Sequence, residues 1–130
     1  VEKGIREINH LTQTKVLKKS SLYTTKPIGP QNQPDFINAV IKISTNNEPI
    51  ALLDILQEIE QQHNRKRIKR WGPRTLDLDI IIFNELEINE DRLTIPHPEM
   101  IKRDFVLIPL LEITNYDFLI PKYGKIKKFI

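Results

Sequence analysis

Two aspartates, Asp77 and Asp79, open an apolar run with the sequence LDLDIIIF (residues 76–83). Alternate residues of a β-strand share one face, so a strand here would place both carboxylates side by side. Aspartate is a poor strand former, which makes two of them at the start of a strand indicative of a function. Paired carboxylates suit Mg²⁺, which takes one or two of them together with substrate phosphates. An exposed polar face on an edge strand is the alternative interpretation.

A cluster of positive charge lies just before the aspartates, because residues 61–75 contain six cations and no acid. These cations are Arg65, Lys66, Arg67, Lys69, Arg70 and Arg74. Arginine forks bind phosphate oxygens through two hydrogen bonds, and phosphoryl-transfer sites hold an anion between such groups and metal ions. A solvated loop is the other interpretation of a charge run. The sequence contains neither a Walker P-loop nor a dinucleotide glycine fingerprint, so arginines and metal would have to hold any phosphates.

Aromatic and amide side chains are the candidates for binding a flat heterocycle. Trp71, the only tryptophan, precedes a Gly-Pro turn and suits either a core anchor or a cover for a planar ring. Phe36 and Asn38 share one face of a predicted strand, where they supply a ring for stacking and an amide for hydrogen bonds. His97, between two prolines, is a candidate for a phosphate contact or a helix cap, whereas His63 is expected at the surface.

Apolar spacing predicts the elements that must position these side chains. Helices are expected at residues 1–11, 49–62 and 98–103, strands at 15–25, 36–44 and 76–83, and a hairpin within 84–95. Pro109 is expected to limit any helix over residues 105–113. This order predicts an α+β sandwich with an antiparallel or mixed sheet. If a strand normally precedes the first helix, the order becomes that of a ferredoxin-like domain whose first strand is missing here.

Composition and length indicate one domain spanning residues 1–130. The chain of 130 residues is 39% hydrophobic, which is enough for one core, and 28% charged. No apolar run approaches the ~20 residues of a membrane helix, and the first residues lack the apolar centre of a signal peptide. The absence of cysteine excludes disulfides and thiolate metal sites, and the three histidines are too scattered for zinc. We therefore expect a cytoplasmic, monomeric protein.

The segment RWGPRTLDLDIIIF (residues 70–83) closely resembles the 6-hydroxymethyl-7,8-dihydropterin pyrophosphokinase family, folate-pathway enzymes that move a diphosphate group from ATP to a pterin alcohol. Three more segments resemble this family in the same order: SSLYTTKPIGPQNQPDFINAV (20–40) its pterin-side loop and strand, NRKRIKRWGPR (64–74) its arginine loop, and RLTIPHPEMIKRDFVLIPLLEI (92–113) its ATP-side segment. The resemblance implies a ferredoxin-like α+β sandwich with a mostly antiparallel sheet and helices on its faces. The family's opening strand has no counterpart in this sequence.

The resemblance also implies a role for each candidate residue. Asp77 and Asp79 would hold two Mg²⁺ ions between the phosphates of ATP and the pterin hydroxymethyl oxygen, and Arg65 and Arg74 would assist transfer. The residues implied for the pterin pocket are Thr25, Ile28, Phe36, Asn38, Trp71 and Phe105. Those implied for the ATP side are Gln57, Glu60, Arg67, Arg70, Arg92, Thr94, His97 and Arg103. The expected partners are ATP and the pterin, without nucleic acid or membrane.

Three other functions compete with this one. A basic, tryptophan-containing loop on a ferredoxin-like sheet could bind nucleic acid, although residues 76–120 then carry ten acids against three bases. A Mg²⁺-dependent nuclease could use the same two aspartates. A catalytically silent fragment or structural partner is the third alternative, because the first strand of the expected fold is missing.

Overall fold

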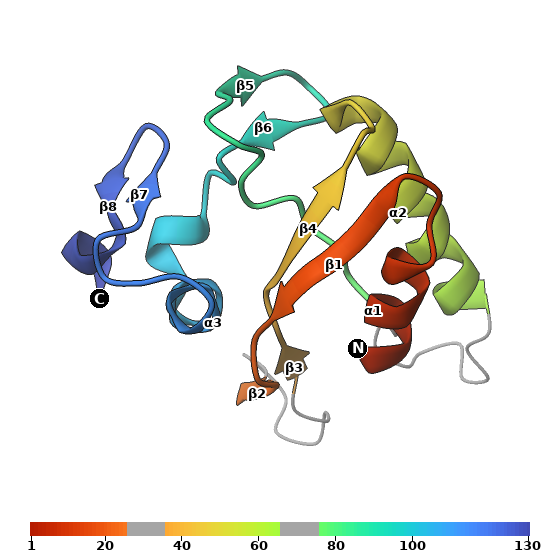
Figure 1. Ribbon diagram of the computed structural model, residues 1–130, viewed down its shortest axis with the longest axis horizontal. Coiled ribbons are helices and arrows are strands. Elements are labelled where there is room, and N and C mark those ends of the chain that lie inside the picture. Colours follow the sequence, from red (N-terminus) through yellow and green to blue (C-terminus); the bar gives the residue numbers. More distant parts are fainter. Residues whose placement is uncertain (26–35, 66–75) are drawn as a thin grey trace.

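A computed structural model describes residues 1–25, 36–65 and 76–130 as helices and short strands (Figure 1). The helices are α1 (Glu2–Asn9), α2 (Pro49–Arg65) and α3 (Asp104–Glu112), with 3-10 turns η1 (Met100–Lys102) and η2 (Ile126–Phe129). The strands are β1 (Thr14–Lys19), β2 (Tyr23–Thr25), β3 (Phe36–Asn38), β4 (Ile41–Thr45), β5 (Ile88–Asn89), β6 (Thr94–Ile95), β7 (Leu119–Ile120) and β8 (Gly124–Lys125). The predicted α+β class is confirmed.

The strands of the described ranges form four separate antiparallel pairs: β1 with β4, β2 with β3, β5 with β6, and β7 with β8. The longest pair aligns Thr14 with Thr45 and Lys19 with Ile41, and a bulge leaves Leu17 without a partner in the ladder. The predicted hairpin within residues 84–95 is confirmed as β5 and β6. A single ferredoxin-like sheet is not formed by these pairs and stays a prediction.

Each of the two long predicted strands is divided in two, and Ser20 marks the point of division. The backbone ladder continues to Ser20 N, which donates to Val40 O at 2.9 Å. The buried Ser20 hydroxyl then accepts a hydrogen bond from Val40 N at 2.9 Å, in the place of a backbone carbonyl. Because a serine hydroxyl competes with the ladder in this way, the β1–β4 ladder stops here and β2 pairs with β3 as a separate ladder.

The predicted strand at residues 76–83 is wrong, since no ladder joins this segment to another strand of the described ranges. The predicted alternation of faces is present only over residues 76–80, where Leu76 and Ile80 are buried and Asp77 and Asp79 are exposed. Residues 81–83 are all half-buried. Other bonds replace the ladder. Leu78 N donates to Glu60 Oε2 at 2.8 Å, and His97 N donates to Ile81 O at 2.8 Å. The segment is thus held by a side chain of α2 and by the loop after β6.

Two apolar clusters form the core. The first packs α1 and α2 against the β1–β4 pair and the segment at residues 76–83. Gly4 lets α1 approach this segment closely, because a Cβ at residue 4 would lie 3.0 Å from the Leu76 side chain. His63 of α2 lies 3.0 Å from Glu7 of α1, and its side chain is only 15% exposed, so the expected surface position of His63 is wrong. This first cluster therefore positions the start of the aspartate segment.

The second cluster surrounds α3, and its buried members include Met100, Leu107, Ile120 and Ile126. The helix runs through Pro109, contrary to the expectation that this proline would limit it. A proline inside a helix removes one backbone hydrogen bond. Here Pro109 itself is buried beside Leu107 and Leu110, and burial of this apolar face offsets the missing bond. None of the helices in the described ranges is long and apolar enough to cross a membrane.

Candidate active site

The β2–β3 hairpin carries three of the residues predicted for the pterin pocket. Thr25 pairs with Phe36 and Tyr23 pairs with Asn38 across the two strands. The Asn38 amide donates to Thr25 Oγ1 at 2.9 Å, which orients its carbonyl oxygen and leaves its second N–H for a ligand. The Phe36 ring is 48% exposed although it is large and apolar. The structure therefore brings together an oriented amide, a hydroxyl and an open aromatic surface.

Phe105, the fourth described member of the predicted pocket, lies in the first turn of α3. Its ring is 39% exposed, and the Arg103 guanidinium carbon lies 5.5 Å from the ring centroid. This separation is within the range of a cation–π interaction. α3 contacts both β2 and β3, so the helix that carries Phe105 packs against the hairpin that carries Phe36 and Asn38. Arg103, predicted for the ATP side, thus adjoins a residue predicted for the pterin side.

Residues predicted for the ATP side meet along one flank of α2. Arg92, in the turn between β5 and β6, donates to Gln57 Oε1 at 3.0 Å and to Asp54 Oδ1 at 2.5 Å. Glu60, one turn beyond Gln57, uses its carboxylate to hold Leu78 N at 2.8 Å. Leu78 lies between the two aspartates, so Glu60 connects the ATP-side flank of α2 to the predicted metal site.

His97 and Thr94 belong to the β6 strand and the loop that follows it. His97 uses its backbone N–H to bind Ile81 O, while its Nδ1 accepts a hydrogen bond from Glu99 N at 3.1 Å. Because Nδ1 is the acceptor, Nε2 carries the proton of the neutral ring and is available as a donor to an anion. Thr94 is half-buried and pairs with Asn89 in the β5–β6 ladder. These contacts fix the loop beside the aspartate segment.

Asp77 and Asp79 are exposed residues in a segment whose Leu76 and Ile80 are buried, at 7% and 8% exposure. Across the ranges that the structure describes, no three His, Asp or Glu residues gather in a way that could hold a metal. A Mg²⁺ ion held by this pair would complete its coordination with waters and phosphate oxygens, which is how Mg²⁺ is bound beside phosphorylated substrates. The oxygen donors that are present fit such an ion.

The other predicted site residues fall at or beyond the edges of the described ranges. Arg65 is the last residue of α2. Ile28, Arg67, Arg70, Trp71 and Arg74 lie outside the described residues. Their predicted roles in ring stacking and phosphate binding stay predictions.

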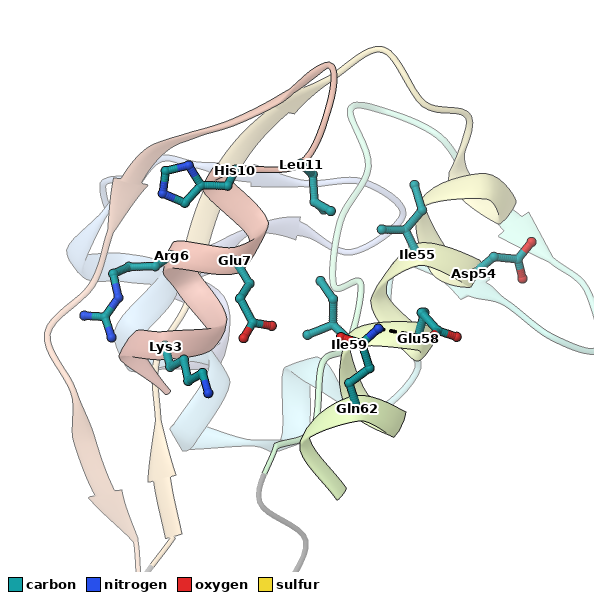
Figure 2. A pocket seen from close by; sticks show the side chains of 10 residues that line it. All are labelled: Lys3, Arg6, Glu7, His10, Leu11, Asp54, Ile55, Glu58, Ile59 and Gln62. Atoms are coloured by element: carbon teal, nitrogen blue, oxygen red, sulfur yellow. Dashed lines mark hydrogen bonds between the residues drawn. The ribbon is translucent and has the colours of Figure 1, made fainter. Parts of the chain in front are cut away.

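A groove of about 780 Å³ lies between α1 and α2, and its lining includes Asp54, the partner of Arg92 (Figure 2). Apolar Leu11, Ile55 and Ile59 form its floor, and charged side chains of both helices form its rim. None of its lining residues was predicted for the site. The mixed charges of the rim and the absence of an oriented polar group in the floor make it a poor match for ATP or a pterin.

The sequence resembles one family of enzymes over most of its length. The family model for 7,8-dihydro-6-hydroxymethylpterin-pyrophosphokinase (HPPK) matches residues 1–115. The chain belongs to the HPPK family. This membership agrees with the paired aspartates on one face and with the aromatic and amide side chains of the β2–β3 hairpin.

Curated members of the HPPK family show the extent of the likeness. Proteins named 2-amino-4-hydroxy-6-hydroxymethyldihydropteridine pyrophosphokinase are 49% identical in Haemophilus influenzae over 118 residues, 43% in Pseudomonas aeruginosa over 113, and 48% in Bacillus subtilis over 98. These alignments cover 91%, 87% and 75% of this chain, respectively. They cover 73%, 70% and 59% of the three relatives, so the chain spans only part of the length of each.

Two acidic residues that contact candidate site residues or the β2–β3 hairpin were not selected from the sequence. Asp54 contacts Arg92, and Glu112 accepts hydrogen bonds from Ser21 and Tyr23. Hydrogen bonds from Tyr23 and then Ser21 lower the pKa of Glu112, and the same carboxylate raises the pKa of Tyr23. Asp54 lies three residues before Gln57 on α2, and this spacing predicts that both side chains share one helix face. Glu112 gave no such signal, because its partners are about ninety residues away in the chain.

Proposed function

We propose that this chain transfers the diphosphate group of ATP to 6-hydroxymethyl-7,8-dihydropterin, a step of folate biosynthesis, and releases AMP. The observation that carries the proposal is the family match over residues 1–115. The curated relatives share the name of this pyrophosphokinase activity. The two aspartates are exposed on a segment whose backbone is bound by Glu60 of α2 and by His97, and this arrangement supports the same chemistry.

The reaction needs no protein nucleophile. The pterin hydroxymethyl oxygen forms a bond to the β-phosphorus of ATP, and the bond from the bridging α,β-oxygen to that phosphorus breaks. AMP leaves with the bridging oxygen and its electron pair, and the hydroxyl proton passes to solvent. Positioning and charge neutralisation supply most of the rate enhancement in such transfers. When bound by Asp77 and Asp79, two Mg²⁺ ions would neutralise phosphate charge and bring the two substrates together.

The β2–β3 hairpin and the start of α3 are proposed to bind the pterin. Phe36 and Phe105 offer exposed rings for stacking on the heterocycle. The Asn38 amide, fixed by its bond to Thr25, offers one carbonyl and one N–H to the polar edge of the ring. Ile28 and Trp71 would complete this pocket.

The flank of α2 and the β5–β6 turn are proposed to bind ATP. Arg92 donates to Gln57 Oε1 and offers its remaining guanidinium N–H groups to phosphate oxygens. His97, whose Nδ1 accepts from Glu99 N, offers its Nε2–H beside the aspartate segment. The remaining residues proposed for this side are Glu60, Arg67, Arg70, Thr94 and Arg103. Arg65 and Arg74 are proposed to neutralise the transferred diphosphate, since guanidinium forks match phosphate oxygens.

The decisive assay measures nucleotide release from MgATP with and without the pterin, and separates AMP from ADP. We expect AMP to form only when the pterin is present. Formation of ADP would indicate transfer of a single phosphoryl group and would overturn the proposal. Cleavage of a phosphodiester without ATP would favour the nuclease. Tight, salt-dependent binding of single-stranded nucleic acid without AMP release would favour the binding module.

Substitution of Arg92 tests the ATP side. Arg92→Ala is expected to raise the KM for MgATP about tenfold, because charge-assisted hydrogen bonds are worth about 1.5–3 kcal/mol. The ion pair with Asp54 is exposed at both ends, so loss of that pair should change stability by less than about 1 kcal/mol.

Asp54→Ala is the matched control, because it breaks the same ion pair from the other side. We expect it to leave the KM for MgATP within about threefold. Equal effects of the two variants on this KM would contradict a role for Arg92 in ATP binding and assign its effect to the ion pair alone.

A further inference from the structure

The last residue of α3 is bonded to the segment that leads into β2. Glu112 Oε1 and Oε2 accept Ser21 N at 3.0 and 2.9 Å, Oε2 also accepts the Ser21 hydroxyl at 2.8 Å, and Oε1 accepts the Tyr23 hydroxyl. One carboxylate thus receives three donor groups from two residues. We call this arrangement, formed by Glu112, Ser21 and Tyr23, the Glu112 clamp.

A carboxylate at this position has an electrostatic cost that the clamp offsets. The carbonyl end of a helix carries partial negative charge, so a glutamate in the last turn is unfavourable there. Charge-assisted hydrogen bonds from three donors compensate for this. They also lower the pKa of Glu112, so its carboxylate is ionised at neutral pH and able to accept all of them. The residue is exposed, and burial of apolar surface does not account for its position.

The clamp joins the two elements that carry the pterin-side residues. Phe105 lies on α3 seven residues before Glu112, which is about 10 Å along a helix that rises about 1.5 Å per residue. Tyr23 belongs to β2 and pairs with Asn38, while Thr25 pairs with Phe36. The bonds of Glu112 therefore set how the hairpin with Asn38 and Phe36 sits against the helix with Phe105.

We propose that Glu112 is a positioning residue for the pterin site: it holds the β2–β3 hairpin against α3 so that Asn38, Phe36 and Phe105 face one ligand. This inference rests on the proposed function. Glu112 acts through the hairpin and touches neither substrate. Its removal therefore weakens pterin binding more than ATP binding, since Gln57, Arg92 and Thr94 of the ATP side lie on α2 and the β5–β6 hairpin. Figure 1 shows this hairpin at the other end of the molecule from β2 and β3, and of the described ATP-side residues Arg103 alone adjoins Phe105.

The test compares Glu112→Ala and Glu112→Gln with the unaltered chain. The readouts are kcat, the KM for the pterin, the KM for MgATP, the Kd of the pterin by calorimetry, and Tm. Loss of hydrogen bonds to a charged group predicts a rise of about tenfold in pterin KM and Kd for Glu112→Ala. Glu112→Gln keeps one carbonyl acceptor and should show a smaller rise, about threefold. The KM for MgATP should stay within about twofold.

Two further variants separate positioning from other effects. Tyr23→Phe removes one donor of the clamp, and its effect on pterin Kd should disappear when it is combined with Glu112→Ala, because the two changes remove a shared interaction. Glu87→Gln is the matched control: it removes an exposed glutamate charge just before β5 and should leave every constant unchanged.

Several outcomes would overturn the inference. A parallel rise of both KM values with a fall in Tm would show that Glu112 only stabilises the fold. Unchanged pterin KM and Kd in Glu112→Ala would show that the clamp does not position the site. If the unaltered chain neither binds the pterin nor releases AMP, the proposed function fails and this inference fails with it. AMP release by the unaltered chain together with unaffected variants overturns the inference alone.

Discussion

Replacement of Asp79 by asparagine is expected to lower kcat by at least about 10³-fold, equivalent to about 4 kcal/mol of transition-state stabilisation. The change removes one of the two carboxylates that stand on the exposed face of residues 76–83. An amide oxygen is a much weaker ligand for Mg²⁺ than a carboxylate, so phosphate charge would go uncompensated in the transfer step. Asp77→Asn should have an effect of the same order on kcat. The assay is pterin-dependent AMP release over a range of Mg²⁺ concentrations.

The fold should survive the Asp79 substitution. Asp79 is exposed, and surface substitutions away from special features change stability within about 0.5 kcal/mol. Asp117→Asn is the matched control, because it makes the same chemical change in the loop before β7, where the carboxylate pairs with Lys125 and Lys127. It should leave kcat unchanged. Turnover within tenfold of the unaltered chain in both Asp77→Asn and Asp79→Asn would contradict the metal assignment.

Truncation of Leu107 should strongly destabilise the fold without touching the site. Leu107 is 1% exposed on α3 and packs among Met100, Leu110, Ile120 and Ile126. A buried leucine replaced by alanine loses transfer free energy and leaves a cavity, at a cost of about 3 kcal/mol of unfolding free energy. The measurement is chemical denaturation, in which the midpoint should fall while the dependence of unfolding free energy on denaturant concentration stays unchanged.

Leu119→Ala provides the comparison for Leu107. This substitution makes the same change of side chain at a residue of β7 that is 64% exposed. Its cost should stay below about 0.5 kcal/mol, as for other surface substitutions. Similar losses in the two variants would show that the cluster around α3 does not form the second part of the core.

The positions of the helices and of their apolar faces could largely be predicted from the sequence. The stripe that includes Leu53, Leu56 and Ile59 predicted α2, which begins at Pro49 as expected and extends to Arg65. Such patterns are local, because residues three and four apart meet on one helix face whatever the rest of the chain does. Pro109 shows the limit of local rules: its buried contacts outweigh the hydrogen bond it removes.

The strands were harder to predict, because a strand exists only with a partner. Over residues 76–80 the alternation correctly predicted that Leu76 is buried and that Asp77 and Asp79 are exposed. It did not predict that α2 and the His97 loop, instead of a neighbouring strand, would bind the backbone of this segment. Ser20 likewise divided two continuous apolar patterns through a contact with Val40, twenty residues away.

The sequence by itself determined the family, the α+β class and the chemistry of the candidate residues, since side-chain type and short-range spacing carry that information. The tertiary structure alone decided which side chains contact one another, including side chains such as Glu112 that were not candidates. Arg92 meets Asp54 and Gln57, and Glu112 meets Ser21 and Tyr23, across separations of 35 to 91 residues. Contacts over such distances depend on how the helices and hairpins pack, and no local pattern in the chain specifies that packing.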